Sequence, residues 1–188
     1  RAAGFFGLTV PERFGGAEVP LATYLAVLEA LARGDGSTAL AFMMHLKTFG
    51  QERDAPSYPP EWLGQMARGA LEHGYLVNTV ATEEGRGSPA GGGLPETVAI
   101  PSGDGWLLDG RKTFATLAPV LHYFIVLARV PVLEGETPRV SNFMVLRTDP
   151  GVRIEETWDS LGMRATGSHD VVFDGVRLSP ERLLNGRA

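Results

Sequence analysis

A glycine-rich segment, ATEEGRGSPAGGG, carries the residue types most suited to cofactor chemistry. Within it, Gly85, Gly87 and Ala90 satisfy the spacing G-x-G-x-x-G/A of a dinucleotide-binding turn. Such a turn binds pyrophosphate because its glycines admit close backbone approach and because a helix begins there with its N-terminus toward the charge. Pro89 and three consecutive glycines oppose a helix at that point. The spacing alone therefore does not predict a Rossmann fold, and a solvated loop is the simplest alternative.

Other titratable residues offer few alternatives. Glu83 and Glu84 lie in the same segment, but adjacent carboxylates in a loop point in different directions, which favours a surface role over general-base catalysis. Arg164, in GMRATGS, is expected to hold a turn rather than an anion. The sequence has no cysteine, which excludes thiol nucleophiles and zinc–thiolate sites. We expect no metal, because the histidines lack ligand spacing and are expected to be structural or exposed: His45, His73, His122 and His169.

Composition restricts the class of protein. The chain has 188 residues, of which 44% are hydrophobic and 21% charged, as in ordinary globular domains. A net charge of -5 without a Lys/Arg cluster argues against nucleic-acid binding. No apolar run approaches the roughly 20 residues of a membrane span, and the start lacks the blocks of a signal peptide. We therefore expect a cytoplasmic protein with no membrane span and no nucleic-acid partner.

The first part of the chain has helical periodicity. Apolar residues at i, i+3, i+4 and i+7 predict an amphipathic helix over residues 20–33. Ser37 or Thr38 is expected to cap a second helix, whose residues 39–46 leave almost no polar face and are therefore expected to be buried on most sides. A third helix is predicted over residues 61–73.

From Tyr75 onward the pattern changes to strands separated by turns. YLVNTVAT is followed by TVAI, a Ser-Gly-Asp-Gly turn, WLL, an Asp109-Gly110 turn and KTFAT, which predicts two successive hairpins. Because no helix of ordinary length separates the strands, we expect an antiparallel sheet. The fold class is therefore α+β, with a helical domain over residues 1–74 and a β-barrel or sandwich domain over residues 75–188. Further strands are predicted at residues 123–130, 140–147, 152–156 and 170–178.

Four motifs, in order along the chain, resemble the acyl-CoA dehydrogenase family. GLTVPERFGG is similar to the family's G-L-x-x-P-x-x-x-G-G turn before a helix, and ATEEGRGS is similar to its A-x-T-E-x-x-x-G-S flavin loop. LDGRKTFAT is similar to its L-N-G-x-K-x-W-I-T strand, and GMRATGSHDVVFDGVRLSPERLL to its G-x-R-x-x-x-x-x-x-V-x-F-x-x-V-x-V-P segment. The resemblance covers nearly the whole chain and implies the family's N-terminal helical domain and middle β domain.

The resemblance implies a flavin site at the ends of β-strands. Thr82 and Thr116 would flank the flavin ring, and Phe114 would form its aromatic wall. A strand end can present a backbone N–H and a hydroxyl to the ring edge, and a glycine loop can present amides to phosphates. Ser88 is also the implied substrate-binding residue, where pyrophosphate or acyl-thioester groups would pass. The implied cofactor-binding residues are Ala81, Thr82, Gly87, Ser88, Phe114, Ala115 and Thr116.

The implied cofactor is FAD, and the implied reaction is α,β-dehydrogenation of an acyl-CoA thioester. An electron-transfer flavoprotein or similar acceptor would take the electrons from a homotetramer or homodimer. Glu84, Pro89 and Phe114 depart from the family pattern, where Pro, Asp and Trp are usual. These departures keep open a flavin-dependent monooxygenase of the same fold that uses reduced flavin and oxygen, and a non-catalytic scaffold is a third alternative. The family's carboxylate base lies in a C-terminal helical domain, so we expect a fragment that lacks the catalytic base and is inactive alone.

Overall fold

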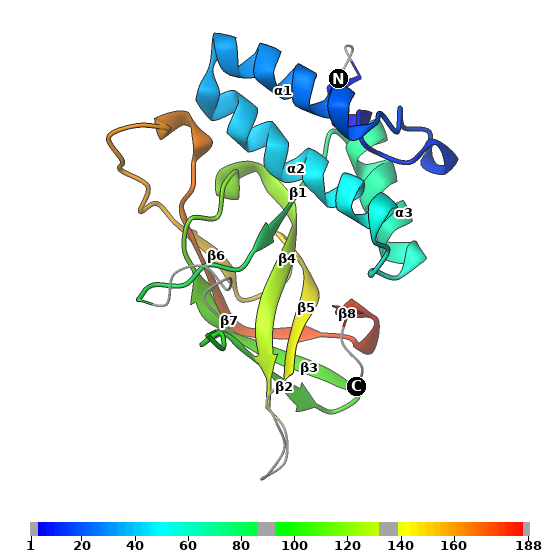
Figure 1. Ribbon diagram of the computed structural model, residues 1–188. Helices are drawn as coiled ribbons and strands as arrows, with labels where there is room; N and C mark the ends of the chain where they lie inside the picture. The colour runs from blue at the N-terminus through cyan, green and yellow to red at the C-terminus, as the bar shows by residue number, and fades with distance from the viewer. Residues whose placement is uncertain (1–3, 86–92, 132–138, 186–188) are drawn as a thin grey trace.

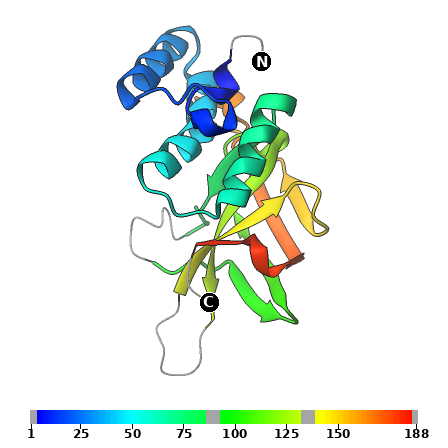
Figure 2. The same ribbon diagram turned by 90° about the vertical axis from the view of Figure 1, so that its right-hand side faces the viewer.

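The molecule has two layers, one of helices and one formed by a β-sheet with its connecting loops. The computed structural model describes residues 4–85, 93–131 and 139–185. In two perpendicular views the helices lie over one end of the β-sheet, and α2 lies between α1 and the sheet (Figures 1 and 2). The predicted α+β fold class, with an N-terminal helical region followed by a sheet, is confirmed.

The three long helices begin and end close to their predicted positions. α2 is capped by Asp35, whose carboxylate accepts hydrogen bonds from the backbone N–H groups of Ser37 (3.3 Å) and Thr38 (2.7 Å). The prediction that Ser37 or Thr38 caps this helix is therefore wrong. Asp35 alone separates the two helices, and its extended backbone directs its side chain at the first free N–H groups of α2. The helices are α1 (Leu21–Gly34), α2 (Gly36–Asp54) and α3 (Pro60–Arg68), and α3 continues into a π-helical turn over Gly69–His73.

Within the described residues, eight strands form one sheet in the order β6-β7-β3-β2-β4-β5-β8, with β1 paired to β4. Most neighbours are antiparallel, as predicted. However, β1 runs parallel to β4 from Leu76 opposite Leu121 to Val80 opposite Val126. β2 is also parallel to β4, with Val98 opposite Arg129. The prediction of an entirely antiparallel sheet is wrong at these two pairs, because β1, β2 and β4 run in the same direction and only β3 between them is opposed. The strands are β1 (Leu76–Val80), β2 (Val98–Ser102), β3 (Gly105–Lys112), β4 (Leu121–Val130), β5 (Arg139–Leu146), β6 (Val152–Glu155), β7 (Asp170–Leu178) and β8 (Leu183–Asn185).

The predicted turn at Asp109-Gly110 is a β-bulge inside β3, so β2 and β3 form one hairpin rather than the first of two. The register of β3 against β7 shifts between Leu108 and Gly110. Gly110 has φ 153°, and a Cβ there would lie 2.4 Å from the hydroxyl oxygen of Thr97, so only glycine fits. The carboxylate of Asp109 accepts the backbone N–H of Gly175 (2.8 Å), which anchors the bulge to β7. Asp-Gly therefore marks a bulge in this chain.

Both faces of β4 are buried, which explains its nearly continuous apolar sequence. Phe124 and Val126 face the interior of the sheet domain, whereas Tyr123 and Ile125 face the helical layer. Phe49 from α2 and other apolar helix residues complete that second core. Each such fully buried large side chain contributes about 1.5–3 kcal/mol, so β4 joins the two layers into one folded unit.

His45 is a structural residue at the junction of the two layers, as expected. It is completely buried, and its Nδ1 accepts the backbone N–H of Val77 on β1 (3.3 Å). The proton therefore lies on Nε2, which donates to the carbonyl of Phe6 (3.1 Å). Burial lowers the pKa of His45 to about 4, partly opposed by the contact with Phe6. The folded protein thus holds a neutral imidazole well below pH 6.5.

Because unfolded His45 has a pKa near its ordinary value of about 6.5, the unfolded state binds a proton that the folded state does not take up until about pH 4. Stability is therefore expected to fall by about 1 kcal/mol between pH 6 and pH 5, as measured by urea unfolding. Gln can also accept and donate at this position, so His45→Gln is the control, and its loss of stability with falling pH should be smaller. An unchanged pH dependence in that variant would contradict the assignment.

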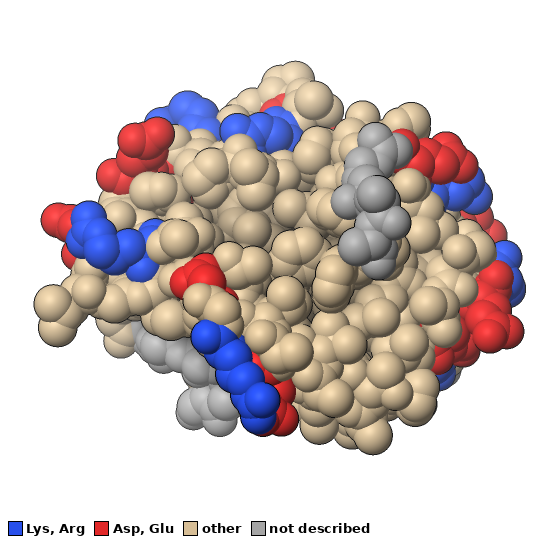
Figure 3. Space-filling model, turned by 90° about the horizontal axis from the view of Figure 1, so that it is seen from above, with Lys and Arg blue, Asp and Glu red and all other residues tan. Residues whose placement is uncertain are grey.

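Charged side chains on the helical face do not gather into a basic patch. Seen from above, blue and red residues are interspersed around a broad area without charge (Figure 3). Every helix in residues 4–85, 93–131 and 139–185 is too short or too polar to cross a bilayer. In the same ranges, no group of three or more His, Asp or Glu side chains is arranged to hold a metal ion.

Candidate functional site

A cavity lies where β1 and β3 end. Its volume is about 690 Å³, within the range of about 300–1,000 Å³ that is usual for small-molecule sites. Four chain segments contribute to it: the residues after β1, the end of β3, the segment after β6 and the start of β7. The lining residues are Thr82, Glu83, Glu84, Gly85, Arg111, Thr113, Phe114, Thr157, Trp158, Asp159, Ser160, Ser168 and Asp170.

The extensions of β1 and β3 bring Thr82 and Phe114 to the same cavity. The backbone N–H of Thr113 donates to the carbonyl of Thr82 (2.9 Å), which holds the two extensions side by side. Phe114 then turns outward, with φ 54° and a relative exposure of 63%. Its ring meets Trp158 edge to face, with centroids 5.7 Å apart and an interplanar angle of 76°. Two aromatic rings therefore border the cavity.

Ala115 and Thr116 lie behind Phe114 and are buried. The N–H of Ala115 donates to the carbonyl of His169 (3.0 Å), and its own carbonyl accepts the N–H of Ala118 (2.9 Å). Ala115 therefore fixes the backbone and has neither group free for a ligand. The Thr116 hydroxyl hydrogen-bonds to Ser168 (2.9 Å), and its carbonyl accepts Nδ2 of Asn78 (3.0 Å). Thr116 is thus held behind Ser168, and neither Ala115 nor Thr116 lines the cavity.

The remaining predicted residues divide into two groups. Ala81 is half-buried, and its carbonyl accepts a hydrogen bond from Nζ of Lys112 (3.4 Å). It lies next to Thr82 at the end of β1, as the motif requires. Gly87 and Ser88 lie outside the described residues. Their roles at the phosphates and the thioester therefore stay predictions.

Glu83 is a buried anchor, so the surface role predicted for it is wrong. It is 6% exposed and accepts Nζ of Lys112 (2.7 Å), which is completely buried. Its carboxylate also accepts hydrogen bonds from the hydroxyl (2.6 Å) and the backbone N–H (2.9 Å) of Thr97 and from the backbone N–H of Glu96 (2.5 Å). Burial raises the pKa of Glu83, but Lys112, Thr97 and these backbone donors outweigh it and lower the pKa to about 2. Glu83 is therefore ionised, and its carboxylate is occupied by these hydrogen bonds. Glu84, by contrast, is exposed on the cavity wall.

Three of the four non-glycine residues with positive φ in the described ranges lie at this site or in the segments next to it. Phe114, Leu117 and Met163 have φ values of 54°, 70° and 56°, in the left-handed region that residues with a Cβ avoid. The N–H of Leu117 donates to the carbonyl of Thr166 (2.9 Å), so the segment after Met163 is tied to the segment after Phe114. Such strain persists only where surrounding contacts enforce it, and it is typical of functional sites.

Sequence reasoning missed Trp158 and Ser168 as cavity residues. Trp158 lies in an irregular segment without periodicity, and it is fixed by hydrogen bonds from its Nε1 to the carbonyl of Met163 (3.1 Å) and from its N–H to Nδ1 of His169 (3.0 Å). Ser168 belongs to the GMRATGS motif, and that motif is the sequence signal that could have indicated it as a cavity residue. Arg164 in that motif donates to Asp159 (2.9 Å) and to the carbonyl of Ser160 (2.8 Å), which confirms its role in holding a turn.

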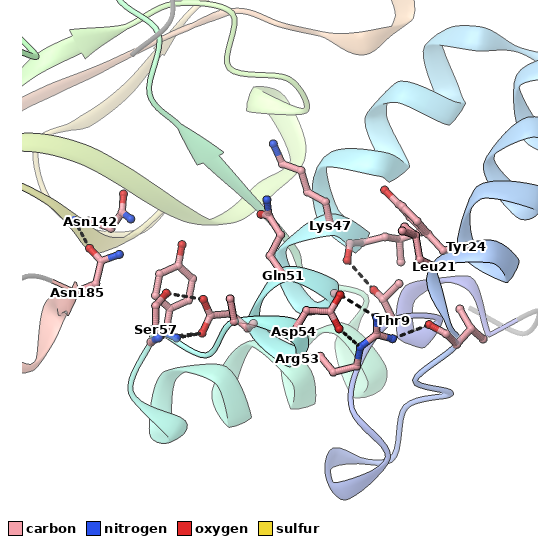
Figure 4. A pocket seen from close by; sticks show the side chains of 16 residues that line it. Thr9, Leu21, Tyr24, Lys47, Gln51, Arg53, Asp54, Ser57, Asn142 and Asn185 are labelled. Atoms are coloured by element: carbon pink, nitrogen blue, oxygen red, sulfur yellow. Dashed lines mark hydrogen bonds and ion pairs between the residues drawn. The ribbon is translucent and has the colours of Figure 1, made fainter. Parts of the chain in front are cut away.

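A second cavity of about 480 Å³ lies between α1, the C-terminal half of α2 and the sheet (Figure 4). Three of its charged groups, Glu52, Arg53 and Asp54, are engaged within the protein. Arg53 donates to Asp54 (2.7 Å) and to the carbonyl of Val19 (2.8 Å). The Glu52 carboxylate accepts hydrogen bonds from the hydroxyl of Ser57 (2.7 Å) and from the backbone N–H of Tyr58. This cavity contains none of the residues implied by the sequence motifs, so the functional site is assigned to the cavity beside Phe114.

Comparison with known families agrees with the motifs. Residues 1–70 match the family model described as "Acyl-CoA dehydrogenase, N-terminal domain", and residues 78–176 match "Acyl-CoA dehydrogenase, middle domain". The chain belongs to the acyl-CoA dehydrogenase family. The resemblance inferred from the four motifs is thereby confirmed. The predicted domain boundary after residue 74 falls between the two matched ranges and stays a prediction.

Members of this family with different activities are similar to the chain. YdbM of Bacillus subtilis (strain 168), which is assigned to the acyl-CoA dehydrogenases, is 39% identical over 184 residues, or 98% of this chain and 47% of YdbM. The amino sugar nitrososynthase RubN8 of Streptomyces rubradiris is 35% identical over 190 residues, or 96% of this chain and 42% of RubN8. The chain thus spans about half the length of the curated relatives it matches.

A solved structure of the same fold contains a flavin. KijD3, in complex with FMN and dTDP-3-amino-2,3,6-trideoxy-4-keto-3-methyl-D-glucose, superposes with a TM-score of 0.83 at 32% sequence identity. The match covers 97% of this chain and 44% of KijD3. The acyl-CoA dehydrogenase fold of this chain therefore also occurs in a protein that binds FMN and a nucleotide sugar.

Proposed function

We propose that this chain forms the flavin-binding part of a flavin-dependent oxidoreductase. The observation that carries the proposal is the cavity beside Phe114, where two aromatic rings and several hydroxyl groups converge from four chain segments. Flavins need an apolar wall beside the ring and hydrogen-bonding groups along its edge. Family membership and the FMN complex of KijD3 support the same cofactor class.

The cavity residues fit a flavin. The hydroxyl oxygen of Thr113 is buried, lines the cavity and has no hydrogen-bond partner among the described residues. An unpaired buried hydroxyl is costly, so a ligand with polar edge atoms would satisfy it. A flavin ring offers such atoms at N3, N5, O2 and O4. The aromatic wall and the free hydroxyl are therefore what a flavin requires.

Each cavity residue then has a separate task. Phe114 and Trp158 would pack against the ring and exclude water from it, while Thr82 and Thr113 would offer hydroxyl groups to its edge. Gly87 and Ser88 stay the predicted contacts of the phosphate chain. When bound, the flavin supplies the ability to accept or donate a hydride.

Within this class, our first candidate is FAD-dependent α,β-dehydrogenation of an acyl-CoA thioester. The relative with 39% identity and the two family models support it. Such a reaction needs a carboxylate base with a pKa near the working pH. Glu83 does not meet this requirement, because it is buried, ionised and paired with Lys112. We propose that the base lies outside residues 1–188. An electron-transfer flavoprotein as acceptor, a homo-oligomeric state and a cytoplasmic location stay predictions from the family resemblance.

The second candidate is a flavin-dependent monooxygenase that receives reduced flavin. The matches to RubN8 and to KijD3 with bound FMN favour it, because the chain resembles both over nearly its whole length. The exposed Phe114 wall is compatible with either reaction. The two candidates differ in the form of flavin that meets the substrate and in the need for oxygen.

One experiment separates them. The protein in its full natural length would be loaded with FAD or FMN and mixed anaerobically with acyl-CoA thioesters of several chain lengths. For a dehydrogenase, the visible absorbance of the flavin is expected to disappear as the thioester is oxidised. For a monooxygenase, it should persist, and oxygen uptake with product formation should require reduced flavin. A protein that binds neither flavin would overturn both candidates and favour a scaffold.

A further inference from the structure

The cavity between α1, α2 and the sheet contains a lysine without a counter-charge. Lys47 is half-buried and lines this cavity, and its ammonium forms no hydrogen bond or ion pair within the part of the chain that the structure describes. Burial lowers the pKa of the Lys47 ammonium, and no described carboxylate offsets that shift. Figure 4 shows the side chains of Lys47 and Gln51 extending away from the Arg53–Asp54 ion pair. The fold therefore does not use the positive charge of Lys47.

A glycine in the same helix keeps the space beside Lys47 open. Gly50 lies three residues after Lys47, so the two residues are neighbours on one face of α2, and both line the cavity. Glycine inside a helix is less stable than alanine. A Cβ at Gly50 would meet no heavy atom within 4 Å, so packing does not require glycine at this position. The effect of Gly50 is to leave room in the cavity next to a free ammonium group.

Apolar side chains form the wall beside this ammonium. Tyr24 and Leu46 are buried and belong to one apolar cluster between α1 and α2. The Tyr24 hydroxyl donates to the carbonyl of Met43 (3.5 Å). In an α-helix that carbonyl also accepts the backbone N–H of Lys47, so the Tyr24 hydroxyl lies close to the Lys47 backbone. Leu21 extends the apolar wall at the start of α1. The cavity thus combines one cation with an apolar surface.

We propose that this cavity binds an organic monocarboxylate with an apolar body, and that the Lys47 ammonium is the counter-charge of the carboxylate. The volume of about 480 Å³ is usual for a small-molecule site. One free ammonium balances one negative charge, and the buried carboxylate of Glu52 in the same cavity opposes a dianion such as a phosphate monoester. The site is separate from the proposed flavin site, since no described residue lines both cavities.

The test titrates sodium octanoate into the protein of full natural length by calorimetry, without added flavin. The wild-type protein should bind octanoate saturably and more tightly than 1-octanol, which carries no charge. Lys47→Met should weaken octanoate binding by about 10- to 100-fold, the effect of one charge-assisted hydrogen bond, and should leave the binding of 1-octanol unchanged. Lys47→Arg keeps the charge and should retain most of the affinity for octanoate.

Two glycine variants test the space beside Lys47. Gly50→Leu should abolish octanoate binding because its side chain occupies the cavity, whereas the unfolding midpoint should not fall. Gly34→Leu is the matched control. Gly34 also lies in a helix, with no heavy atom within 4 Å of a Cβ, but does not line the cavity, so this variant should bind as the wild-type protein does. If the wild-type protein does not bind octanoate, or if either Lys47→Met or Gly50→Leu binds it as tightly as the wild-type protein, the inference is overturned while the proposed flavin site stands.

Discussion

Replacing Lys112 by methionine is expected to destabilise the protein by about 3–5 kcal/mol, because it leaves the Glu83 carboxylate buried without its counter-charge. The Lys112 side chain is completely buried and that of Glu83 is 5% exposed, so water cannot replace the lost partner. The Lys112 ammonium also donates to the carbonyl of Ala81, and its loss would loosen the end of β1. Urea unfolding of the variant and the wild-type protein measures the difference.

A double variant isolates the cause. Glu83→Gln combined with Lys112→Met removes both charges but keeps a carbonyl oxygen for the donors of Thr97, so most of the lost stability should return. Arg33→Ala serves as the matched surface control. Its ion pair with Glu29 joins side chains that are 79% and 67% exposed, and no measurable loss of stability is expected. Equal stability of the Lys112 variant and the wild-type protein would refute the buried-pair assignment.

Replacing Phe114 by alanine is expected to weaken flavin binding by about 10- to 100-fold. Stacking on an aromatic side chain is worth about 1–3 kcal/mol, and Phe114 also supports Trp158 through their edge-to-face contact. Because the Phe114 side chain is 63% exposed, its removal should leave the unfolding midpoint nearly unchanged. Titration of the flavin-free protein with flavin, followed by fluorescence, gives the dissociation constant.

Leu161 provides the matched control for Phe114. Leu161 is fully exposed at 103%, lies in the segment that contains Trp158, and does not line the cavity. Leu161→Ala should therefore bind flavin as the wild-type protein does. If Phe114→Ala also retains the wild-type dissociation constant, the cavity beside it is not the flavin site.

The sequence predicted the elements whose signals are local. Helical periodicity located α1 to within one residue at each end, since a single apolar stripe repeats along it. Alternating and continuous apolar runs located β4, β5 and β7 to within one or two residues for the same reason. The family motifs also placed Thr82 and Phe114 at one site, although neither periodicity nor composition relates these two positions.

Features that depend on distant partners were not predictable in this way. The parallel pairing of β1 with β4 depends on the path of the intervening chain, which no local pattern encodes. Glu83 and Lys112 are 29 residues apart, and each alone resembles an exposed charged residue. Trp158 contributes to the site only because β6 and β7 place its irregular segment opposite Phe114. The sequence therefore predicts the side of the candidate site that the ends of β1 and β3 form. It does not predict the facing side, which Trp158 forms.

The left-handed backbone of Phe114, Leu117 and Met163 has a consequence for protein engineering. Each such residue costs about 1–2 kcal/mol relative to glycine, so replacing it by glycine would relieve local backbone strain. In this molecule Phe114 lines the cavity, while Leu117 and Met163 form hydrogen bonds with Thr166 that join the segments behind it. Relieving this strain and preserving the geometry of the proposed flavin site are therefore opposed requirements at the same residues.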